Sequence, residues 1–388
     1  MNGFTYYTPT KVVFGLGAEA QVGDLVRAQK CKKVLIHYGS GSVKRTGLLD
    51  RIKASLDQAG VAYVELGGVV PNPRLSKARE GIALCKEQGV DFLLAVGGGS
   101  VIDSCKCIGY GVANEGDVWD FYSTDREPEA CLPIGTVLTI AAAGSEMSNS
   151  SVITNEEGWL KRDCSSDLSR PVFSVLNPEL TVTLPDYQTA CGCVDIMMHT
   201  MERYFNSEPE NLDLTDGISE ALMRTVMDNA RILAKEPGNL KARAEIMWAG
   251  SLSHNGLTGC GTDGGDWATH LLEHEMGGMF DVAHGAGLAA VWGSWARYVW
   301  QERPDRFVKF ARNVMGVTGE GTDAEIVEKG IQAVEQFYRD IKMPTSMAEL
   351  GIAPTQAQIE EMAAKSVAEG TVKVLKYEDR VAIFQAAL

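Results

Sequence analysis

Short apolar runs alternate with amphipathic segments through the first half of the chain. The runs predict strands over 33–38, 61–66, 91–96 and 132–140, and the segments between them predict helices over 46–60, 74–89 and 100–112. Short, continuous apolar runs are typical of strands that are buried on both faces of a parallel sheet. The repeated strand–helix–strand order therefore predicts a parallel α/β domain over residues 1–184, with helices on both faces of the sheet.

The pattern changes after Leu184, where the strand-like alternation fades and helical spacing dominates. Pro185 and Asp186 are well placed to begin a helix. Helices are predicted over 186–207, 212–234, 240–257, 270–279, 283–299, 304–315, 323–341 and 355–369. We therefore predict a second, all-helical domain over residues 185–388, joined directly to the first.

A glycine-rich loop follows the apolar run 91–96 and leads into the next predicted helix. Its residues are Gly97, Gly98, Gly99 and Ser100. Residues without a Cβ let a ligand approach the backbone, and a helix N-terminus favours an anion such as a diphosphate. A tight turn with close helix packing is the alternative interpretation.

Two further loops of small residues follow predicted strands. One contains Gly39, Ser40 and Ser42, and the other covers 139–148. Open parallel sheets bind ligands at the carboxyl ends of their strands. The three loops together predict a nucleotide site at that edge of the sheet.

Acidic and histidine side chains recur at helical spacing in the second half. Asp195 and His199 are four residues apart, as are His270 and His274, and His284 follows closely. Residues four apart project from one face of a helix. One carboxylate with three imidazoles suits Fe²⁺ or Zn²⁺ and leaves a position open for substrate.

Two other interpretations of these histidines remain open. Each could be a buried, hydrogen-bonded helix residue. The segment 270–274 also reads H-x-x-E-H, the signature of a zinc peptidase in which both histidines bind zinc and Glu273 activates water. The peptidase hypothesis leaves the glycine loop unexplained. His37 and His254 show no such spacing and are predicted to be structural.

Composition narrows the classes of partner. The 388 residues carry 36 Lys and Arg against 51 Asp and Glu, a net charge of −15, which argues against a nucleic-acid polymer as partner. Apolar runs stay well short of a membrane span, and the first residues do not resemble a secretory signal. The nine scattered cysteines are typical of free thiols in a reducing cytoplasm. We expect a cytoplasmic protein without a membrane partner.

The motifs, taken in order, resemble one known family. They are Pro9-Thr10, Phe14-Gly15-Leu16-Gly17, Pro71-Asn72-Pro73, GGGSVID at 97–103, AGSEMS at 143–148, Asp195 with His199, and the stretch from His270 to His284. The chain is similar over essentially its whole length to the iron-containing (group III) alcohol dehydrogenases, and within them to the butanol dehydrogenase-like, NADPH-dependent aldehyde reductases. This resemblance implies a Rossmann-like dinucleotide-binding domain and an all-helical metal-binding domain with the metal in the cleft, an architecture like that of dehydroquinate synthase.

The resemblance also implies roles for single residues. The metal ligands would be Asp195, His199, His270 and His284, and His274 would be a non-ligand near the nicotinamide and a candidate proton relay. The glycine loop from Gly97 to Ser100 would hold the diphosphate, Asp103 would lie near the nicotinamide, and Thr139 and Lys161 would contact the cofactor. Family members are expected to form homodimers.

The chain departs from the family pattern in two places. The family often has Thr-Gly-Ser-Glu after the third strand, whereas Ala143 here lacks that hydroxyl. Family members that use NAD carry an acidic residue just after the first strand, where this chain has Ser40 and Ser42 with Lys44-Arg45 nearby. A carboxylate there would bind a ribose hydroxyl and repel a 2′-phosphate, so we predict NADP(H) over NAD(H).

The predicted activity is hydride transfer between NADP(H) and a small primary alcohol or aldehyde, with the metal polarising the carbonyl oxygen. A metal-dependent lyase or synthase of the dehydroquinate synthase-like class is the main alternative, and the zinc peptidase is the second. The residues do not distinguish iron from zinc.

Overall fold

The computed structural model describes residues 1–206 and 212–388, which divide into two compact units. One unit is Thr8–Thr183, and the other joins Met1–Tyr7 to Leu184–Leu388. The sequence pattern placed the first seven residues with the α/β domain. They belong with the helical unit because the Asn2 amide donates to the Gly261 carbonyl at 3.0 Å.

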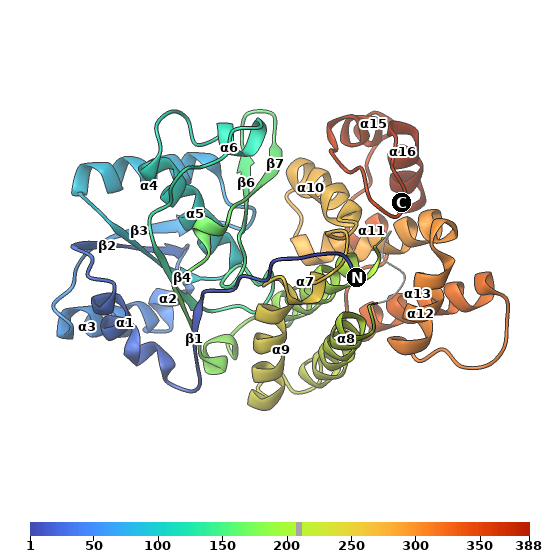
Figure 1. The fold of residues 1–388 in the computed structure, drawn as a ribbon, viewed down its shortest axis with the longest axis horizontal. Coiled ribbons are helices and arrows are strands. Elements are labelled where there is room, and N and C mark those ends of the chain that lie inside the picture. Colours follow the sequence, from blue (N-terminus) through green and yellow to red (C-terminus); the bar gives the residue numbers. More distant parts are fainter. Residues whose placement is uncertain (207–211) are drawn as a thin grey trace. The chain divides into compact units, whose positions relative to one another are not determined.

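A six-stranded parallel sheet forms the centre of the α/β unit (Figure 1). Its order is β1-β8-β5-β4-β2-β3, and every neighbouring pair is parallel. The strands are β1 (Lys11–Phe14), β2 (Lys33–Gly39), β3 (Ala62–Val69), β4 (Phe92–Gly97), β5 (Ile134–Leu138) and β8 (Phe173–Leu176). All residues of β4, β5 and β8 are buried, as expected of strands covered on both faces.

Helices cover both faces of this sheet (Figure 1). They are α1 (Val22–Ala28), α2 (Ser42–Arg45), α3 (Leu48–Gln58), α4 (Leu75–Gln88) and α5 (Gly99–Ala113), and a short helix, α6 (Asp120–Ser123), follows α5. Alternate residues of one strand face opposite sides: Ile36 of β2 packs in the core with α1 and α3, whereas His37 bonds to Ser104 of α5. The predicted fold class, a parallel α/β unit followed by an all-helical one, is confirmed.

The sequence pattern did not predict β1, β8 or an antiparallel hairpin of β6 (Ser150–Asn155) and β7 (Leu160–Ser165). Short 3₁₀ helices at Ala18–Gln21, Asp167–Ser169 and Pro178–Thr181 complete the unit. The hairpin packs on α5, where Ser151 donates its hydroxyl to the carbonyl of Asp103 at 3.1 Å. It therefore contacts the helix that follows the glycine loop.

The second unit consists of helices. They are α7 (Asp186–Tyr204), α8 (Asp213–Leu233), α9 (Leu240–Ser253), α10 (Ala268–Phe280), α11 (His284–Val299), α12 (Pro304–Asn313), α13 (Asp323–Asp340), α14 (Met347–Leu350), α15 (Gln356–Lys365) and α16 (Tyr377–Ala386), with 3₁₀ turns at Leu257–Gly259 and Trp300–Glu302. Ser207, the last residue of one predicted helix, lies outside the described residues. In the described ranges, no helix combines the length and apolar character that a membrane crossing requires.

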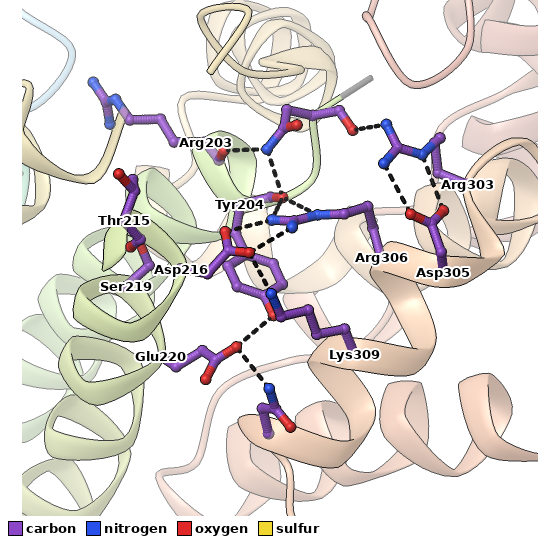
Figure 2. A network of polar contacts seen from close by, with 12 residues as sticks. Arg203, Tyr204, Thr215, Asp216, Ser219, Glu220, Arg303, Asp305, Arg306 and Lys309 are labelled. Carbon is purple, nitrogen blue, oxygen red and sulfur yellow. Dashed lines mark hydrogen bonds and ion pairs between the residues drawn. The ribbon is translucent and has the colours of Figure 1, made fainter. Parts of the chain in front are cut away.

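Helix α7 lies at the centre of this unit and ends in a buried ion-pair network (Figure 2). The Arg306 guanidinium donates to both carboxylate oxygens of Asp216, at 2.7 and 2.9 Å, and to the Tyr204 carbonyl. Lys309 donates to the same carboxylate at 2.5 Å. The network ties the last turn of α7 to α8 and α12, and α7 carries two of the predicted metal ligands.

Candidate metal centre and cofactor loops

Helices α7, α10 and α11 bring the four predicted metal ligands together. Asp195 and His199 lie one turn apart on α7, and the distance from His199 Nδ1 to Asp195 Oδ1 is 3.4 Å. The Nε2 atoms of His270 on α10 and His284 on α11 are each 3.6 Å from the same oxygen. The first three side chains are buried, and His284 is partly exposed. One carboxylate oxygen therefore faces three imidazole nitrogens.

Three of these four atoms have no hydrogen-bond partner among the residues that the structure describes. They are Asp195 Oδ1, His199 Nδ1 and His270 Nε2. Buried polar atoms are almost always bonded, and leaving one unpaired costs roughly 1–3 kcal/mol. Ligand atoms of these residues lie within 4.8 Å of one another. A divalent metal would satisfy all of them at once, and oxygen with imidazole nitrogen suits Fe²⁺ or Zn²⁺.

Buried carboxylates hold the rear nitrogens of two of the histidines. His270 Nδ1 bonds to Glu202 on α7, whose other oxygen accepts the His270 amide at 3.0 Å. His284 Nδ1 bonds to Glu273 on α10. Such outer carboxylates fix ring orientation and direct Nε2 of each ring toward the metal position. Sequence analysis missed Glu202 as an outer partner, although it lies seven residues after Asp195 and therefore on the same helix face.

The pKa values of two histidines in this cluster are shifted in opposite directions. Burial lowers the pKa of His199 far below its usual range, and the nearby His254, His270 and Arg203 lower it further. Burial would also lower the pKa of His270, but the carboxylates of Glu202 and Asp195 outweigh it and raise that pKa to about 9. The carboxylates of Glu202 and Asp195 thus place negative charge beside His270.

His274 lies next to His284. It is buried on α10, and its ring centroid is 6.1 Å from that of His284. Glu273, which would activate water in the peptidase hypothesis, instead binds the ring of His284. The structure gives His270 and His274 different surroundings, although helical spacing alone makes them equivalent.

His254, predicted from its lack of spacing to be structural, lies beside the cluster. Its ring centroid is 4.1 Å from that of His199, and its Nδ1 is 3.0 Å from the Arg203 guanidinium. It follows the last residue of α9, 55 positions after His199 along the chain, so no local spacing could have revealed it. His37 behaves as predicted, with both ring nitrogens bonded inside the α/β unit.

The glycine loop joins β4 to α5. A Cβ on Gly98 would lie 2.0 Å from Ile140, and one on Gly99 would lie 3.1 Å from Ala143. Close packing of the segment after β5 thus explains Gly98 without a ligand, as the alternative interpretation held. The amides of Gly99 and Ser100 still open a 15-residue helix, which favours an anion.

The other two predicted loops follow the strands on either side of β4. Gly39 ends β2, and Ser40 and Ser42, which follow it, are both exposed. Thr139 follows β5, and its amide donates to the Gly97 carbonyl at 3.0 Å. Because β2, β4 and β5 are adjacent and parallel, the three loops lie together at the carboxyl ends of these strands.

Asp103 and Lys161 have different surroundings within the α/β unit. Asp103 on α5 accepts the Ser145 hydroxyl at 2.6 Å and the Val152 amide at 3.1 Å, so it anchors the segment after β5. The buried ammonium of Lys106, one turn later, donates to the Ser145 and Ser148 carbonyls. Lys161 is buried on β7, opposite Thr154.

Comparison with known proteins shows which family the chain belongs to. Residues 9–178 match the model described as iron-containing alcohol dehydrogenase, and 189–388 match the C-terminal model of that family. The chain is 39% identical to NADH-dependent butanol dehydrogenase A of Clostridium acetobutylicum, over 99% of both proteins, and 37% identical to the NADPH-dependent aldehyde reductase YqhD of Escherichia coli, over 91% of this chain and 90% of that protein.

Comparison with solved structures points to the same family. The crystal structure of NADH-dependent butanol dehydrogenase A from Thermotoga maritima matches with a TM-score of 0.95 and 37% identity, over 100% of this chain and 99% of that one. The predicted family is confirmed: the chain belongs to the iron-containing alcohol dehydrogenases.

Proposed function

We propose that this chain is a metal-dependent dehydrogenase that moves a hydride between a nicotinamide cofactor and a primary alcohol or its aldehyde. The observation that carries the proposal is the set of buried, unpaired donor atoms on Asp195, His199 and His270. Family membership supports the same reaction, because similar proteins are named butanol dehydrogenase and aldehyde reductase.

Asp195, His199, His270 and His284 would hold one Fe²⁺ or Zn²⁺. When bound, such a metal supplies a Lewis acid that polarises the oxygen of the substrate. The chain contributes orientation, since Glu202 and Glu273 fix two of the rings, and it surrounds most of the site with buried side chains. We infer that these groups pre-organise the site, so that the hydride chemistry belongs to the cofactor.

Reduction of an aldehyde requires a proton for the product oxygen, and His274 is proposed to supply it. The side chain is buried, and its ring centroid is 6.1 Å from that of His284. A His274→Ala variant should keep its metal and lose kcat. Loss of metal from that variant would instead identify His274 as a ligand.

The contacts of Glu273 favour this proposal over a zinc peptidase. That carboxylate would have to face water between two histidine ligands of α10, but it binds Nδ1 of His284. A synthase of the dehydroquinate synthase-like class fits the same ligands. It uses the cofactor transiently, so it would show no net oxidation or reduction of the nicotinamide.

We propose NADP(H) as the preferred cofactor. From Gly39 to Arg45 the chain carries no carboxylate that would repel a 2′-phosphate. Ser40 and Ser42 are exposed there, and the Lys44 ammonium lies 5.1 Å from the Tyr38 ring centroid. The similar proteins divide between NADH and NADPH, so comparison of kcat/KM for the two cofactors is the test.

A homodimer and a cytoplasmic location complete the proposal. Strand β1 lies at one edge of the sheet, and its last residue, Phe14, and the nearby Leu16 are exposed. All nine cysteines are free, which suits a reducing compartment. Light scattering of the purified chain would test the dimer, and a monomer at micromolar concentration would contradict it.

The activity itself is tested by following NADPH absorbance with a panel of small aldehydes, before and after metal chelation and re-addition of Fe²⁺ or Zn²⁺. We expect turnover that chelation removes and metal restores. His199→Ala should lose metal and activity together and leave the α/β unit folded by circular dichroism, with His274→Ala as the variant that keeps metal. Full turnover without bound metal would refute the proposal.

A further inference from the structure

His199 differs from the other two candidate histidine ligands in how its ring is supported. His270 and His284 each present Nε2 to Asp195 and bond through Nδ1 to a buried glutamate. His199 presents Nδ1 instead, and within the described chain no glutamate holds its other nitrogen. Another group must therefore fix this ring if the site is to be pre-organised.

The guanidinium of Arg203 lies where that support is needed. Arg203 is buried one turn after His199 on α7, and its Nη1 donates to the carbonyls of His199 at 2.9 Å and Ser253 at 3.0 Å. Its Nη2 lies 3.0 Å from His254 Nδ1, and its Cζ lies 4.5 Å from the ring centroid of Trp267. One side chain thus joins α7, the end of α9 and the residue before α10.

The contact with Arg203 determines which nitrogen of His254 accepts a hydrogen bond and how the His254 ring is oriented. A guanidinium only donates hydrogen bonds, so Nδ1 of His254 must be the acceptor. The donors of arginine form a rigid planar fork, so the bond sets the direction of the ring as well as its distance. That ring lies 4.1 Å from the ring of His199, centroid to centroid, with the planes tilted by 43°.

The loop before α10 is shaped around the same arginine. A Cβ on Gly259 would lie 3.1 Å from Arg203 Cδ, and one on Gly265 would lie 3.1 Å from Arg203 Cα and 2.8 Å from the Glu202 carbonyl. The backbone of Trp267, which covers the guanidinium, is left-handed with φ of 60°. Close packing and an unusual backbone conformation together hold Trp267 over Arg203.

We propose that Arg203 is a positioning residue of the metal centre: it clamps His254 and Trp267 around His199 and takes the part that a glutamate plays for His270 and His284. This inference rests on the proposed function, in which His199 holds the metal. A lysine at position 203 would keep the charge but could not reach two carbonyls and a ring nitrogen in one plane.

A second arginine of the same helix end provides a matched control. Arg306 is also buried and also donates to a backbone carbonyl of α7, that of Tyr204. Figure 2 shows the side chain of Arg203 pointing away from the Asp216–Arg306 pair, while the Arg203 carbonyl accepts the Asn206 amide. Arg306→Lys therefore weakens the end of α7 without touching His199, His254 or Trp267.

The experiment uses the full chain loaded with Co²⁺, whose visible spectrum reports ligand geometry. Affinity is measured by competition with a chelator, and the folding of each metal-free variant by urea denaturation. We expect Arg203→Lys to bind Co²⁺ about 10–100-fold more weakly, with a shifted spectrum, as when an outer partner of a metal ligand is lost. Arg306→Lys should lose folding stability and change affinity by no more than about twofold, the range within which independent sites add.

Two substitutions of His254 separate the hydrogen bond from the ring contact. His254→Asn keeps an acceptor for Arg203, and His254→Phe keeps a ring but removes the acceptor, so the second should impair Co²⁺ binding more. Unchanged affinity and spectrum in Arg203→Lys, or equal effects of Arg203→Lys and Arg306→Lys, would overturn the inference while the proposed function stands. A wild-type chain that binds no Co²⁺ would overturn both.

Discussion

Gly285 offers a direct test of whether helix packing sets the metal-site geometry. It follows His284 in the first turn of α11, where α11 meets the backbone of α7. A Cβ at this position would lie 2.1 Å from the Cys191 carbonyl oxygen, 2.7 Å from its carbon and 2.8 Å from Cα of the same residue. Backbone atoms cannot rotate away as a side chain can, so Gly285→Ala must separate the two helices.

The size of that displacement follows from the contact. Heavy atoms pack best at roughly 3.5 Å, so relieving the 2.1 Å approach requires the start of α11 to move by about 1.4 Å. Overpacking of this kind costs about 1–3 kcal/mol of folding stability. Metal–ligand distances tolerate only about 0.2 Å, so a displaced His284 would leave the ligand set. We expect metal affinity to fall by more than the roughly 10–100-fold that follows loss of an outer partner.

A second glycine-to-alanine substitution, at a position without close neighbours, separates the effect of tight packing from the general effect of replacing glycine by alanine. Gly217 is exposed on α8, and a Cβ there has no heavy atom of the described residues within 4 Å. Gly217→Ala should therefore stabilise the chain by about 1 kcal/mol, through helix propensity alone, and leave metal affinity unchanged. Both variants are measured by urea denaturation without metal and by Zn²⁺ competition with a chelator.

The two measurements on Gly285→Ala can refute this reasoning. If the variant loses stability but binds Zn²⁺ as the wild type does, His284 does not depend on the packing of α11 on α7, or it is not a ligand. If stability is also unchanged, the close approach of Gly285 to Cys191 is wrong.

Two further predictions concern buried charge. Burial lowers the pKa of His37 from 6.5 to about 4, so between these values the unfolded chain takes up a proton that the folded chain does not. Stability should fall as pH decreases from 6.5 to 4, by at most about 3 kcal/mol, and urea titrations of His37→Gln should lack that part of the slope. Asp216→Asn leaves the guanidinium of Arg306 buried without its carboxylate and should cost about 3–5 kcal/mol in urea denaturation, so a loss below about 1 kcal/mol would contradict the role of this network.

The fold could be predicted where the sequence pattern is long enough to show a period. Buried strands such as β4 and most of the longer helices of the second half have clear patterns, and the sequence predicts them within a few residues of their observed ends, whereas it does not predict α14 or α16. Strands β1 and β8 have only four residues each, too few to distinguish from loop. Each of them pairs with a strand that is distant in the sequence, so only the tertiary structure identifies them.

The glycine loop shows why one pattern can have two physical causes. The sequence suggested that glycines let a ligand approach, and the open amides at the start of α5 agree with that. Yet Ile140 already occupies the space that a Cβ of Gly98 would fill. Packing requires glycine at this position whether or not a diphosphate binds, so support for a cofactor site comes from the three adjacent loops taken together.

Helical spacing paired Asp195 with His199 and His270 with His274, but it could not say which nitrogen of each ring faces the metal. That choice depends on what holds the opposite nitrogen. Glu273 is three residues after His270 yet serves His284, which lies on the next helix. The spacing of the motif therefore points to the candidate residues of the site, while contacts between helices distinguish one histidine from another, and Glu273, the catalytic glutamate of the H-x-x-E-H interpretation, bonds to His284 instead.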